Sequence, residues 1–519
     1  MRLESSSTHA QQIEVPLDRS SGIPLHRQLR RHFTSLITSN QLGEGQFLPS
    51  TRVLAEALGL NRLTALRAFQ AMQKAGIVRV QPGRGYYVPR RSDSRGPADL
   101  PRDLFGARAT YEARHDHAFS ETVRSAREMP LSFAVGYPDA SMLPLKPIRR
   151  LFGRWSHAFG ADDLLYQSPG GHPLLREQLW KYLAARGIAR TEERELLVTN
   201  GAQHGLDIFV RTFAKGSGYV AMEAPAYYGA LAVVRLNDYV ALPILQDEHG
   251  LSVSSLAALC KSRRFDFLYT NPTYNNPTGM TMSRARREVV VALAREHQFV
   301  ILEDDTYADL GFAGPHPASL MSLDRDHRTC HIGSFSKSFM PGLRMGYVVG
   351  PKALIARMAD IHGVNDMCSS TLSQLVLYDA LASGFYERHA RRMRGIYARR
   401  CRVMKETLSA ELPAGCHFGV PKGGFFFWIR LPEHIECREL QRRCNTVGVD
   451  VALGPDFFAE GYGGNYVRLN FTLLDEDEIR VGIKLLAAQI KGMLGVAEGA
   501  PGLAPQPPLS RSSQSRANP

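Results

Sequence analysis

The 519-residue chain is poor in cysteine and has no cysteine pair at metal or redox spacing. Its cysteines are odd in number, scattered, and lack a CxxC; they are Cys260, Cys330, Cys368, Cys401, Cys416, Cys437 and Cys444. This pattern argues against a disulfide-stapled secreted fold and predicts reduced thiols. Because no cluster of ligand residues appears at a recognisable spacing either, we expect no bound metal.

Long hydrophobic runs are also missing. No run approaches the ~18 apolar residues that a transmembrane helix needs. The N-terminus, MRLESSSTHAQQIEV, lacks the apolar core of a secretory signal. With 44% hydrophobic residues the chain can still bury a large core. We therefore expect a soluble, cytoplasmic protein with at least two domains.

Acidic residues are scarce in one segment only. Residues 21–90 hold ten Lys or Arg but only Glu44 and Glu56 as acids, a net charge of +8. The whole chain carries +13, so the remaining 449 residues contribute only +5. A basic excess this local, on a small domain, predicts a polyanionic partner.

Changes in composition divide the chain into five parts. We expect a flexible N-terminal arm (1–21), a compact basic domain (22–90) and a linker rich in Pro, Arg, Ser and Asp (91–128). From 129 to 495, short apolar strands alternate with amphipathic helices, which indicates an α/β domain. The Pro- and Ser-rich tail 496–519 is predicted to be disordered.

The basic domain has the pattern of a winged helix-turn-helix. Ser50 is placed to cap a helix that Gly59 ends, a second helix follows from Asn61, and a hairpin turns at 82–85. The second helix would present polar groups to base edges and phosphates, while Arg84 at the hairpin tip suits a minor groove. The candidate DNA contacts on that helix are Asn61, Arg62, Thr64 and Arg67.

Lys337, in the run SFSKSF, is the most informative residue of the α/β part. A lysine amine is the group that forms a Schiff base with an aldehyde cofactor. Asp304 ends the apolar strand in VILEDDTY, where a carboxylate can keep a pyridine nitrogen protonated; its neighbour Asp305 is the competing candidate. Tyr307, and Asn276 in NNPTG, can hydrogen-bond a ring hydroxyl.

Other residues fit the remaining parts of such a site. A strand leads into a helix at GAQ, where backbone N–H groups can cradle a phosphate. The residues assigned to that phosphate pocket are Gly201, Ala202, Gln203, Ser334, Ser336 and Arg344. Tyr227 can stack on the ring, and Arg468 in YVRLNF is placed to pair with a substrate carboxylate. Gly136 would let that carboxylate approach the backbone, and PKGGFFFWIRL (421–431) either lines the pocket or belongs to the core.

These motifs resemble those of two known protein families. From PLHRQLRRHF through LPSTR to the GRGYYV hairpin, the basic domain resembles the GntR family of bacterial repressors. The resemblance implies DNA contacts by Arg52, Arg62, Arg67 and Arg84. Residues from about 130 to 490 resemble fold-type I, class I aminotransferases that use pyridoxal 5′-phosphate, with a large α/β domain and a small α+β subdomain. The phosphate loop GAQ departs from that family, because many active members carry a hydroxyl residue there.

A GntR-type winged helix followed by an aminotransferase-like domain is the layout of the MocR subfamily of regulators, which this chain resembles. The resemblance implies a domain-swapped homodimer in which pyridoxal phosphate, or an amino compound that reacts with it, acts as effector. A regulator is the first hypothesis, and its ligand must prefer one domain arrangement. A working aminotransferase with a secondary DNA-binding domain is the second. A protein that binds neither DNA nor cofactor is the third.

Overall fold

In the computed structural model, the chain separates into two compact units, Met1–Tyr111 and Glu112–Pro519. The structure describes residues 2–3, 13–19, 24–38, 41–43, 45–74, 77–81, 84–89, 129–158, 160–213, 218–459 and 462–495. The predicted linker and tail lie outside these residues. None of the helices in the described part is both long and apolar enough to cross a membrane.

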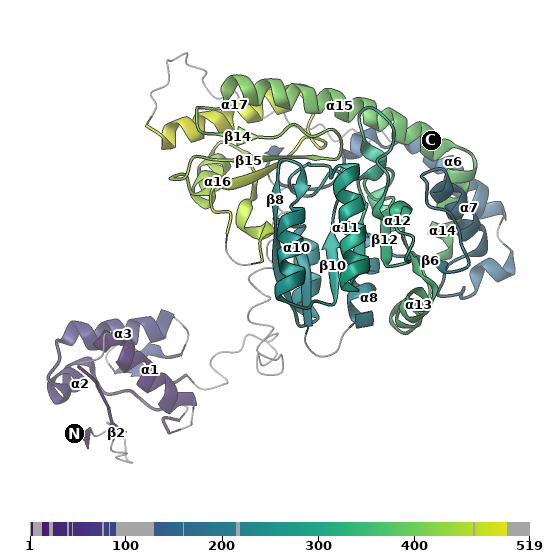
Figure 1. Ribbon diagram of the computed structural model, residues 1–519. Coiled ribbons are helices and arrows are strands. Elements are labelled where there is room, and N and C mark those ends of the chain that lie inside the picture. The colour runs from purple at the N-terminus through teal and green to yellow at the C-terminus, as the bar shows by residue number, and fades with distance from the viewer. Residues whose placement is uncertain are drawn as a thin grey trace, which may run out of the picture. The chain divides into compact units, whose positions relative to one another are not determined.

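The first unit is a three-helix domain with a short hairpin (Figure 1). Its elements are α1 (Leu25–Thr38), α2 (Thr51–Leu58), α3 (Arg62–Lys74), β3 (Arg79–Gln81) and β4 (Gly85–Tyr87), with β1 (Arg2–Leu3) and β2 (Ile13–Glu14) before them. As expected, the Ser50 hydroxyl caps α2 by accepting from the Val53 N–H, and Gly59 ends the helix at φ 58°. Leu29, Phe33 and Phe69 are fully buried between the helices.

Two predictions about this unit need adjustment. The strand expected from Ile77 begins at Arg79, because the Ile77 N–H is bonded to the Met72 carbonyl as the chain leaves α3. The arm expected to be flexible contacts the domain in its described part: Arg19 Nη2 donates to the carbonyls of Leu58 and Gly59. Apolar Val15 and Leu17 pack against the same core, which accounts for the contact.

The second unit is built on an eight-stranded sheet in the order β6-β13-β12-β11-β10-β7-β8-β9. The strands are β6 (Arg194–Thr199), β7 (Gly218–Ala224), β8 (Tyr239–Asp247), β9 (Gly250–Leu251), β10 (Phe267–Thr270), β11 (Val300–Asp304), β12 (Thr329–Ser334) and β13 (Gly346–Pro351). Only β13 and β9 run antiparallel to their neighbours. The carboxyl ends of the others therefore meet at one edge, where α/β sheets hold ligands.

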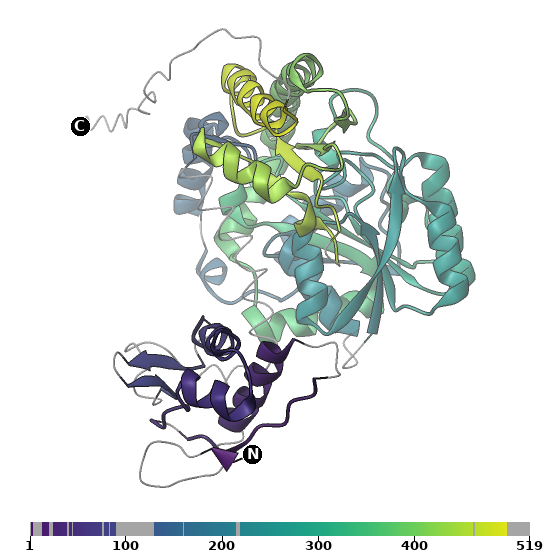
Figure 2. The same ribbon diagram turned by 90° about the vertical axis from the view of Figure 1, so that its left-hand side faces the viewer.

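Helices cover both faces of this sheet (Figures 1 and 2). One face packs against α8 (Ala202–Phe213), α9 (Tyr228–Leu236) and α13 (Lys352–Asp366). The other packs against α6 (Leu145–Ala158), α7 (Pro173–Ala184), α10 (Val253–Ser262), α11 (Arg284–His297), α12 (Leu320–Leu323) and α14 (Thr371–Ala382). Short 3-10 turns are η3 (Ala140–Met142), η4 (Ala161–Leu164), η5 (Ala308–Leu310) and η6 (Pro341–Leu343).

A smaller α+β subdomain follows the 27-residue helix α15 (Phe385–Glu411). Its antiparallel sheet has the order β14-β15-β18-β17. The elements are β14 (His417–Phe418), β15 (Phe426–Arg430), α16 (Cys437–Thr446), β16 (Val449–Asp450), β17 (Ala452–Leu453), η7 (Gly454–Phe457), β18 (Tyr466–Asn470) and α17 (Glu476–Met493), and β16 pairs with the early strand β5 (Leu131–Ser132). The fold is the predicted large α/β domain with a small α+β subdomain.

Candidate functional site

A cavity of about 680 Å³ opens at the carboxyl edge of the eight-stranded sheet. Its walls come from segments that follow β6, β7, β10, β11 and β12, and from β18 of the subdomain. Most of the predicted residues line it: Gly136, Ala202, Gln203, Tyr227, Asn276, Asp304, Tyr307, Ser334, Ser336, Lys337, Arg344 and Arg468. The sheet topology thus brings together motifs that lie far apart in the sequence.

Lys337 lies in the turn after β12 and points its amine into the cavity. Its Nζ donates to the Gly136 carbonyl at 2.5 Å. Burial first, and then the positive charges of Arg468 and Arg344, lower the pKa of Lys337 to about 8. A lysine with this pKa has a sizeable neutral fraction near pH 7, so its amine can act as a nucleophile.

The structure separates the two candidate carboxylates at the end of β11. Asp304 lines the cavity, its Oδ2 accepting from the Tyr269 hydroxyl at 2.8 Å and its Oδ1 from Thr306 Oγ1 at 2.7 Å. Asp305 lies in the opposite direction, near Glu303 and His331. Because successive strand side chains alternate between faces, only one of the two can face the cavity.

Asn276 links three groups of the site. Its Oδ1 accepts from Arg468 Nη1 at 2.9 Å, and its side chain also hydrogen-bonds Tyr307. Burial raises the pKa of Tyr307 far above its usual value, so the tyrosine stays a neutral donor. The Asn276 N–H donates to Asn271 Oδ1 at 2.7 Å, which fixes the position of the NNPTG turn.

Arg468 is held on β18 with its guanidinium at the cavity wall. Its Cζ lies 4.1 Å from the centre of the Phe426 ring and 4.8 Å from that of Phe457. The guanidinium is 1% exposed, and its Nε has no hydrogen-bond partner among the described residues. A buried guanidinium with an unused donor is suited to a carboxylate ligand. Phe426 is itself fully buried and packs against Gly136, and no residue of the described segment 421–431 lines the cavity, so the FFF run belongs to the core.

Several residues predicted to bind phosphate lie where β6 leads into α8. Gly201 has φ +88°, and a side chain there would meet Arg344 Nη2 at 2.8 Å. Arg344 donates to the Asn200 carbonyl at 3.1 Å and to Ser336 Oγ at 3.4 Å. The first-turn N–H groups of α8 and the Arg344 guanidinium thus converge as anion donors.

Tyr227 follows β7 and lines the same cavity. Its hydroxyl donates to Gln203 Oε1 at 3.1 Å, while Gln203 Nε2 donates to the Gly229 carbonyl at 3.0 Å. The Gln203 side chain therefore orients Tyr227. Its backbone N–H remains in the first turn of α8, beside the phosphate pocket.

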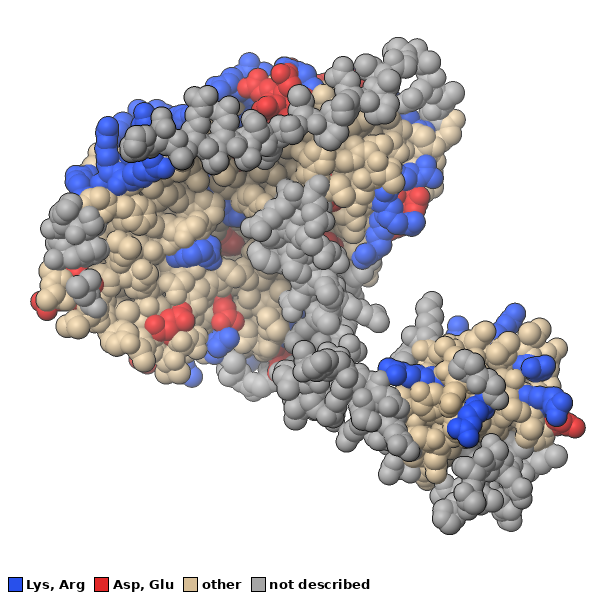
Figure 3. Space-filling model, turned by 180° about the vertical axis from the view of Figure 1, so that it is seen from behind, with Lys and Arg blue, Asp and Glu red and all other residues tan. Residues whose placement is uncertain are grey.

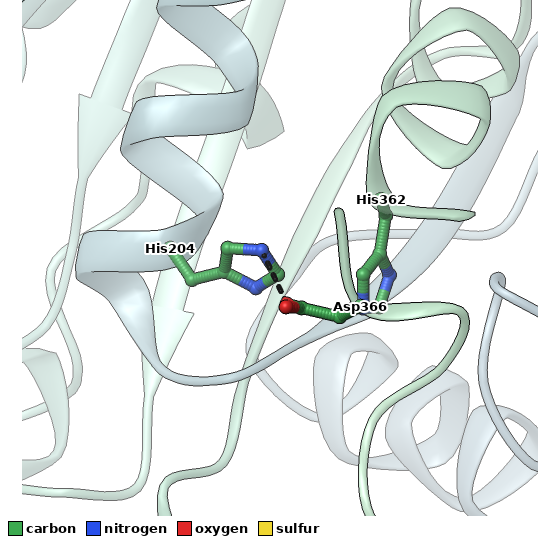
Figure 4. A group of neighbouring side chains, drawn as sticks. All are labelled: His204, His362 and Asp366. Atoms are coloured by element: carbon green, nitrogen blue, oxygen red, sulfur yellow. Dashed lines mark ion pairs between the residues drawn. The ribbon is translucent and has the colours of Figure 1, made fainter. Parts of the chain in front are cut away.

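His204 of α8 and His362 of α13 lie next to Asp366 (Figure 4). His204 Nε2 lies 3.0 Å from Asp366 Oδ2, and Asn200 donates to both residues, to His204 Nδ1 at 3.1 Å and to Asp366 Oδ2 at 2.9 Å. Among the described residues, His204, His362 and Asp366 form one of two groups close enough to hold a metal, and the other is Glu303, Asp305 and His331. His204 Nε2 makes no hydrogen bond among the described residues, so its contact with Asp366 is an ion pair only when the ring is protonated.

Several residues of the site were missed from the sequence. Asn271 Nδ2 donates to the Asp304 carbonyl, and Tyr269 and Thr306 orient the Asp304 carboxylate. Tyr228 and Asp456 line the outer part of the cavity. The one available signal was position, since Asn271 directly follows a buried strand as Asp304 does.

On the first unit, the candidate DNA contacts lie on the surface. Arg52, Asn61, Arg62, Arg67 and Arg84 are exposed and Thr64 is partly exposed. Asn61 has a structural role as well, because its Oδ1 accepts from the Leu63 N–H at 2.8 Å at the start of α3. Ala65, Ala68, Phe69 and Met72 are fully buried on the opposite side of α3, as predicted.

The residues of the cavity fit a phosphorylated aldehyde cofactor with a pyridine ring. The cavity is surrounded by an amine with a lowered pKa, a carboxylate, groups that can hydrogen-bond a ring, and donors that can bind an anion. The buried, unused Nε of Arg468 leaves a donor for a second, anionic group.

Comparisons with known proteins agree with both halves of the chain. Residues 137–486 match the family model "Aminotransferase class I and II", and residues 25–88 match "Bacterial regulatory proteins, gntR family". The HTH-type transcriptional regulator YdfD of Bacillus subtilis is 28% identical over 90% of this chain and 97% of its own length.

Solved structures similar to this chain are aminotransferases. Pyrococcus horikoshii kynurenine aminotransferase, in complex with PMP, superposes with a TM-score of 0.72 at 31% identity, covering 76% of this chain and 98% of that one. Thermus thermophilus LysN, an alpha-aminoadipate aminotransferase complexed with N-(5'-phosphopyridoxyl)-L-leucine, gives 0.70 at 29% identity, covering 77% and 100%.

Proposed function

The chain belongs to the class I and II aminotransferase family and carries a gntR-type regulatory domain at its N-terminus, and from this premise we propose that it is a transcriptional regulator whose aminotransferase-like domain senses a small molecule. The observation that carries the proposal is the presence, on one chain, of a basic winged helix and a complete cofactor-type cavity. Regulators with the same two-part layout are similar to this chain over almost their whole length.

The DNA-binding half acts through its exposed basic residues. Arg62 and Arg67 on α3 contact base edges and phosphates, Arg52 on α2 contacts the backbone, and Arg84 enters the minor groove. Asn61 and Thr64 complete this surface. We place the protein in the cytoplasm, because a bacterial-type gntR regulator works on promoter DNA.

The effector half holds pyridoxal 5′-phosphate, which supplies an aldehyde and an electron-withdrawing ring when bound. Lys337 provides the amine that binds the aldehyde, and Asp304 holds a proton at the ring nitrogen. Tyr307 and Asn276 hydrogen-bond the ring hydroxyl, and Tyr227 covers a ring face. The phosphate is held by backbone N–H groups of Gly201, Ala202 and Gln203 and by Ser334, Ser336 and Arg344.

The sensed ligand is the cofactor itself or an amino compound with a carboxylate. Arg468 binds that carboxylate, and Gly136 leaves room for it beside the backbone. A ligand amine would compete with the Lys337 amine for the cofactor. A ligand carboxylate on Arg468 of the subdomain would add a contact that exists only in the ligand-bound state, and such a difference in affinity is what a switch requires.

We extend the proposal to the assembly and to the domain limits. The protein is a homodimer in which each winged helix crosses to its partner's large domain. The arm 1–21 precedes the winged helix, which spans 22–90. The linker 91–128 joins the winged helix to the effector domain 129–495, and the tail 496–519 follows. Light scattering combined with a mixed-chain DNA-binding assay tests the swapped arrangement.

A second candidate function is catalytic amino transfer. It is favoured by one observation, that Lys337, Asp304 and Arg468 all line the cavity together. The two functions differ in turnover, since an enzyme passes amino groups to 2-oxo acids many times per site.

The deciding experiment is DNA selection from a random duplex pool by the purified protein, with and without pyridoxal phosphate and a pool of amino acids. Specific binding that changes with the small molecules supports the regulator. Absence of specific binding in every condition, together with many amino-transfer turnovers per site, supports the aminotransferase instead.

A further inference from the structure

One face of the long helix α15 is lined with arginines. Between Glu387 and Glu406 the helix carries eight Lys or Arg and no Asp or Glu. Five of the arginines are exposed, and their spacing of three, four and seven residues puts them on a single side of the helix. They are Arg388, Arg391, Arg392, Arg399 and Arg402, and we call them the arginine stripe.

The neighbouring helix α6 repeats the pattern. It contains no acid, and its exposed cations again recur at intervals of three and four residues; they are Lys146, Arg149, Arg150 and Arg154. Arg392 Nη1 donates to the Met142 carbonyl at 3.2 Å, which ties the stripe to the residues just before α6. Figure 3 shows Lys and Arg gathered along this upper edge of the large unit.

Each helix has an exposed glycine within its basic face. A Cβ added at Gly395 of α15 or at Gly153 of α6 would meet nothing within 4 Å. Neither glycine is therefore required by packing, although glycine in a helix interior is less stable than alanine. Each leaves a gap among the long cationic side chains, where another molecule can approach the helix backbone closely.

Ion pairing within the chain does not account for the stripe. Arg399 pairs with Glu476 at 3.4 Å, and Arg154 of α6 pairs with Asp379 at 2.8 Å. Neither Arg391 nor Arg402 has an ion-pair or hydrogen-bond partner among the described residues. Like charges three and four residues apart destabilise a helix. The stripe therefore costs stability in the free chain, and an external polyanion would offset that cost.

We propose that the arginine stripe and the basic face of α6 bind the sugar-phosphate backbone of duplex DNA outside the sequence held by the winged helix. The proposal rests on the function proposed above, which brings duplex DNA to this chain. The stripe covers 15 residues from Arg388 to Arg402, whose Cα atoms lie about 21 Å apart along the helix axis. Duplex DNA carries about a dozen charges over that length, and guanidinium groups match phosphate oxygens in pairs.

The chemistry of α15 favours DNA over a membrane surface. A helix that lies on a membrane buries large apolar side chains below its basic residues. Among the described residues, the exposed large apolar side chains include none from α15, although Leu145 and Phe152 of α6 are exposed. The stripe thus offers charge alone, which suits a sequence-independent contact with phosphates.

The test compares a triple variant, Arg388→Gln, Arg391→Gln and Arg402→Gln, with a control that removes three exposed cations elsewhere on the large unit, Lys261→Gln, Lys352→Gln and Arg357→Gln. Both are measured in the full-length protein on a selected duplex, trimmed to its footprint or extended by about 20 base pairs on each side. We expect the stripe variant to lower the slope of log K against log salt by about 2 to 3 on the extended duplex. On the trimmed duplex it should match the control.

The other outcomes separate this proposal from the regulator. Equal slopes for the two variants on the extended duplex would overturn the DNA surface while leaving the regulator intact. Equal losses on both duplexes would also overturn it, because they would indicate general attraction without contact to flanking DNA. A duplex of random sequence is measured in parallel. If the wild-type protein binds the random and the selected duplex equally well, the proposed regulator function is contradicted, independently of the result for the stripe. Loss of binding to phosphatidylglycerol vesicles with unchanged DNA binding would assign the stripe to a membrane instead.

Discussion

Arg468 donates through Nη1 to the Oδ1 of Asn276 at 2.9 Å, across 192 residues of sequence. This bond joins the small subdomain to the large domain inside the cavity. Asn276 also hydrogen-bonds Tyr307, so one amide positions both a residue proposed for the ring and the residue proposed for the ligand carboxylate. The residues proposed for the cofactor and for the ligand are therefore linked through Asn276.

The first prediction follows from this link. Asn276→Asp places a carboxylate against the Arg468 guanidinium and so competes with a ligand carboxylate. We expect the affinity for propionate, a simple carboxylate probe, to fall roughly 10- to 100-fold. Asn237→Asp, on the end of α9, is the matched control and should leave it unchanged. Unchanged propionate affinity in Asn276→Asp would show that Arg468 does not bind the carboxylate.

Gly201→Ala tests the phosphate pocket. The added Cβ would lie 2.8 Å from Arg344 Nη2, at a φ of +88° that disfavours any side chain. We expect pyridoxal phosphate to bind at least about tenfold more weakly, while pyridoxal, which lacks the phosphate, changes little. Gly342→Ala is the control, because a Cβ there meets nothing within 4 Å. If Gly201→Ala weakens the binding of pyridoxal phosphate and of pyridoxal equally, the phosphate does not bind at Gly201.

Asp304→Asn and Asp305→Asn separate two neighbours that sequence alone left as alternatives. Asp304→Asn should weaken cofactor binding and shift the absorbance of the bound cofactor, because a charge near the ring is lost. Burial, and then the charge of Glu303, raise the pKa of Asp305. Its replacement by a neutral amide should therefore alter the spectrum little. A larger spectral change in Asp305→Asn would reverse the assignment.

The sequence predicted the residues that directly follow buried strands, because the carboxyl ends of parallel strands meet at one edge. Asp304 at the end of one strand and Gly201 after another were found in this way, whereas Lys337 was found from the SFSKSF motif. Alternation of side chains could not decide between Asp304 and Asp305 without knowing which face of the sheet held the cavity. Asn271 was missed because an Asn-Pro pair is ordinary turn chemistry. The contact of Lys337 with Gly136 depends on how β18 and the segment after β5 pack, and no local pattern encodes that.

The pKa of Lys337 gives a pH-dependent prediction. At pH 7 a pKa of about 8 leaves about one amine in ten neutral, against about one in three thousand at the usual 10.5. The rate of pyridoxal phosphate uptake by the cofactor-free protein should rise with pH and level off above about 8. Arg468→Gln removes one positive neighbour and should move this midpoint upward. The free cofactor titrates in the same way in the experiments with the unchanged protein and with Arg468→Gln. Identical midpoints for the two proteins would therefore show that the charge of Arg468 does not lower the pKa of Lys337.

The last prediction divides labour between the two units. Arg62→Ala removes an exposed guanidinium from the start of α3 and should weaken binding to the selected duplex roughly 5- to 100-fold, the range of one lost DNA contact. Arg468→Ala should leave DNA affinity without ligand unchanged but abolish its response to amino compounds. Arg357→Ala, which also removes one exposed cation, controls for net charge. DNA binding and ligand response would be measured on the same protein samples by fluorescence anisotropy. If Arg62→Ala and Arg468→Ala lose DNA affinity equally, the winged helix and the cavity cannot have the separate roles proposed for them.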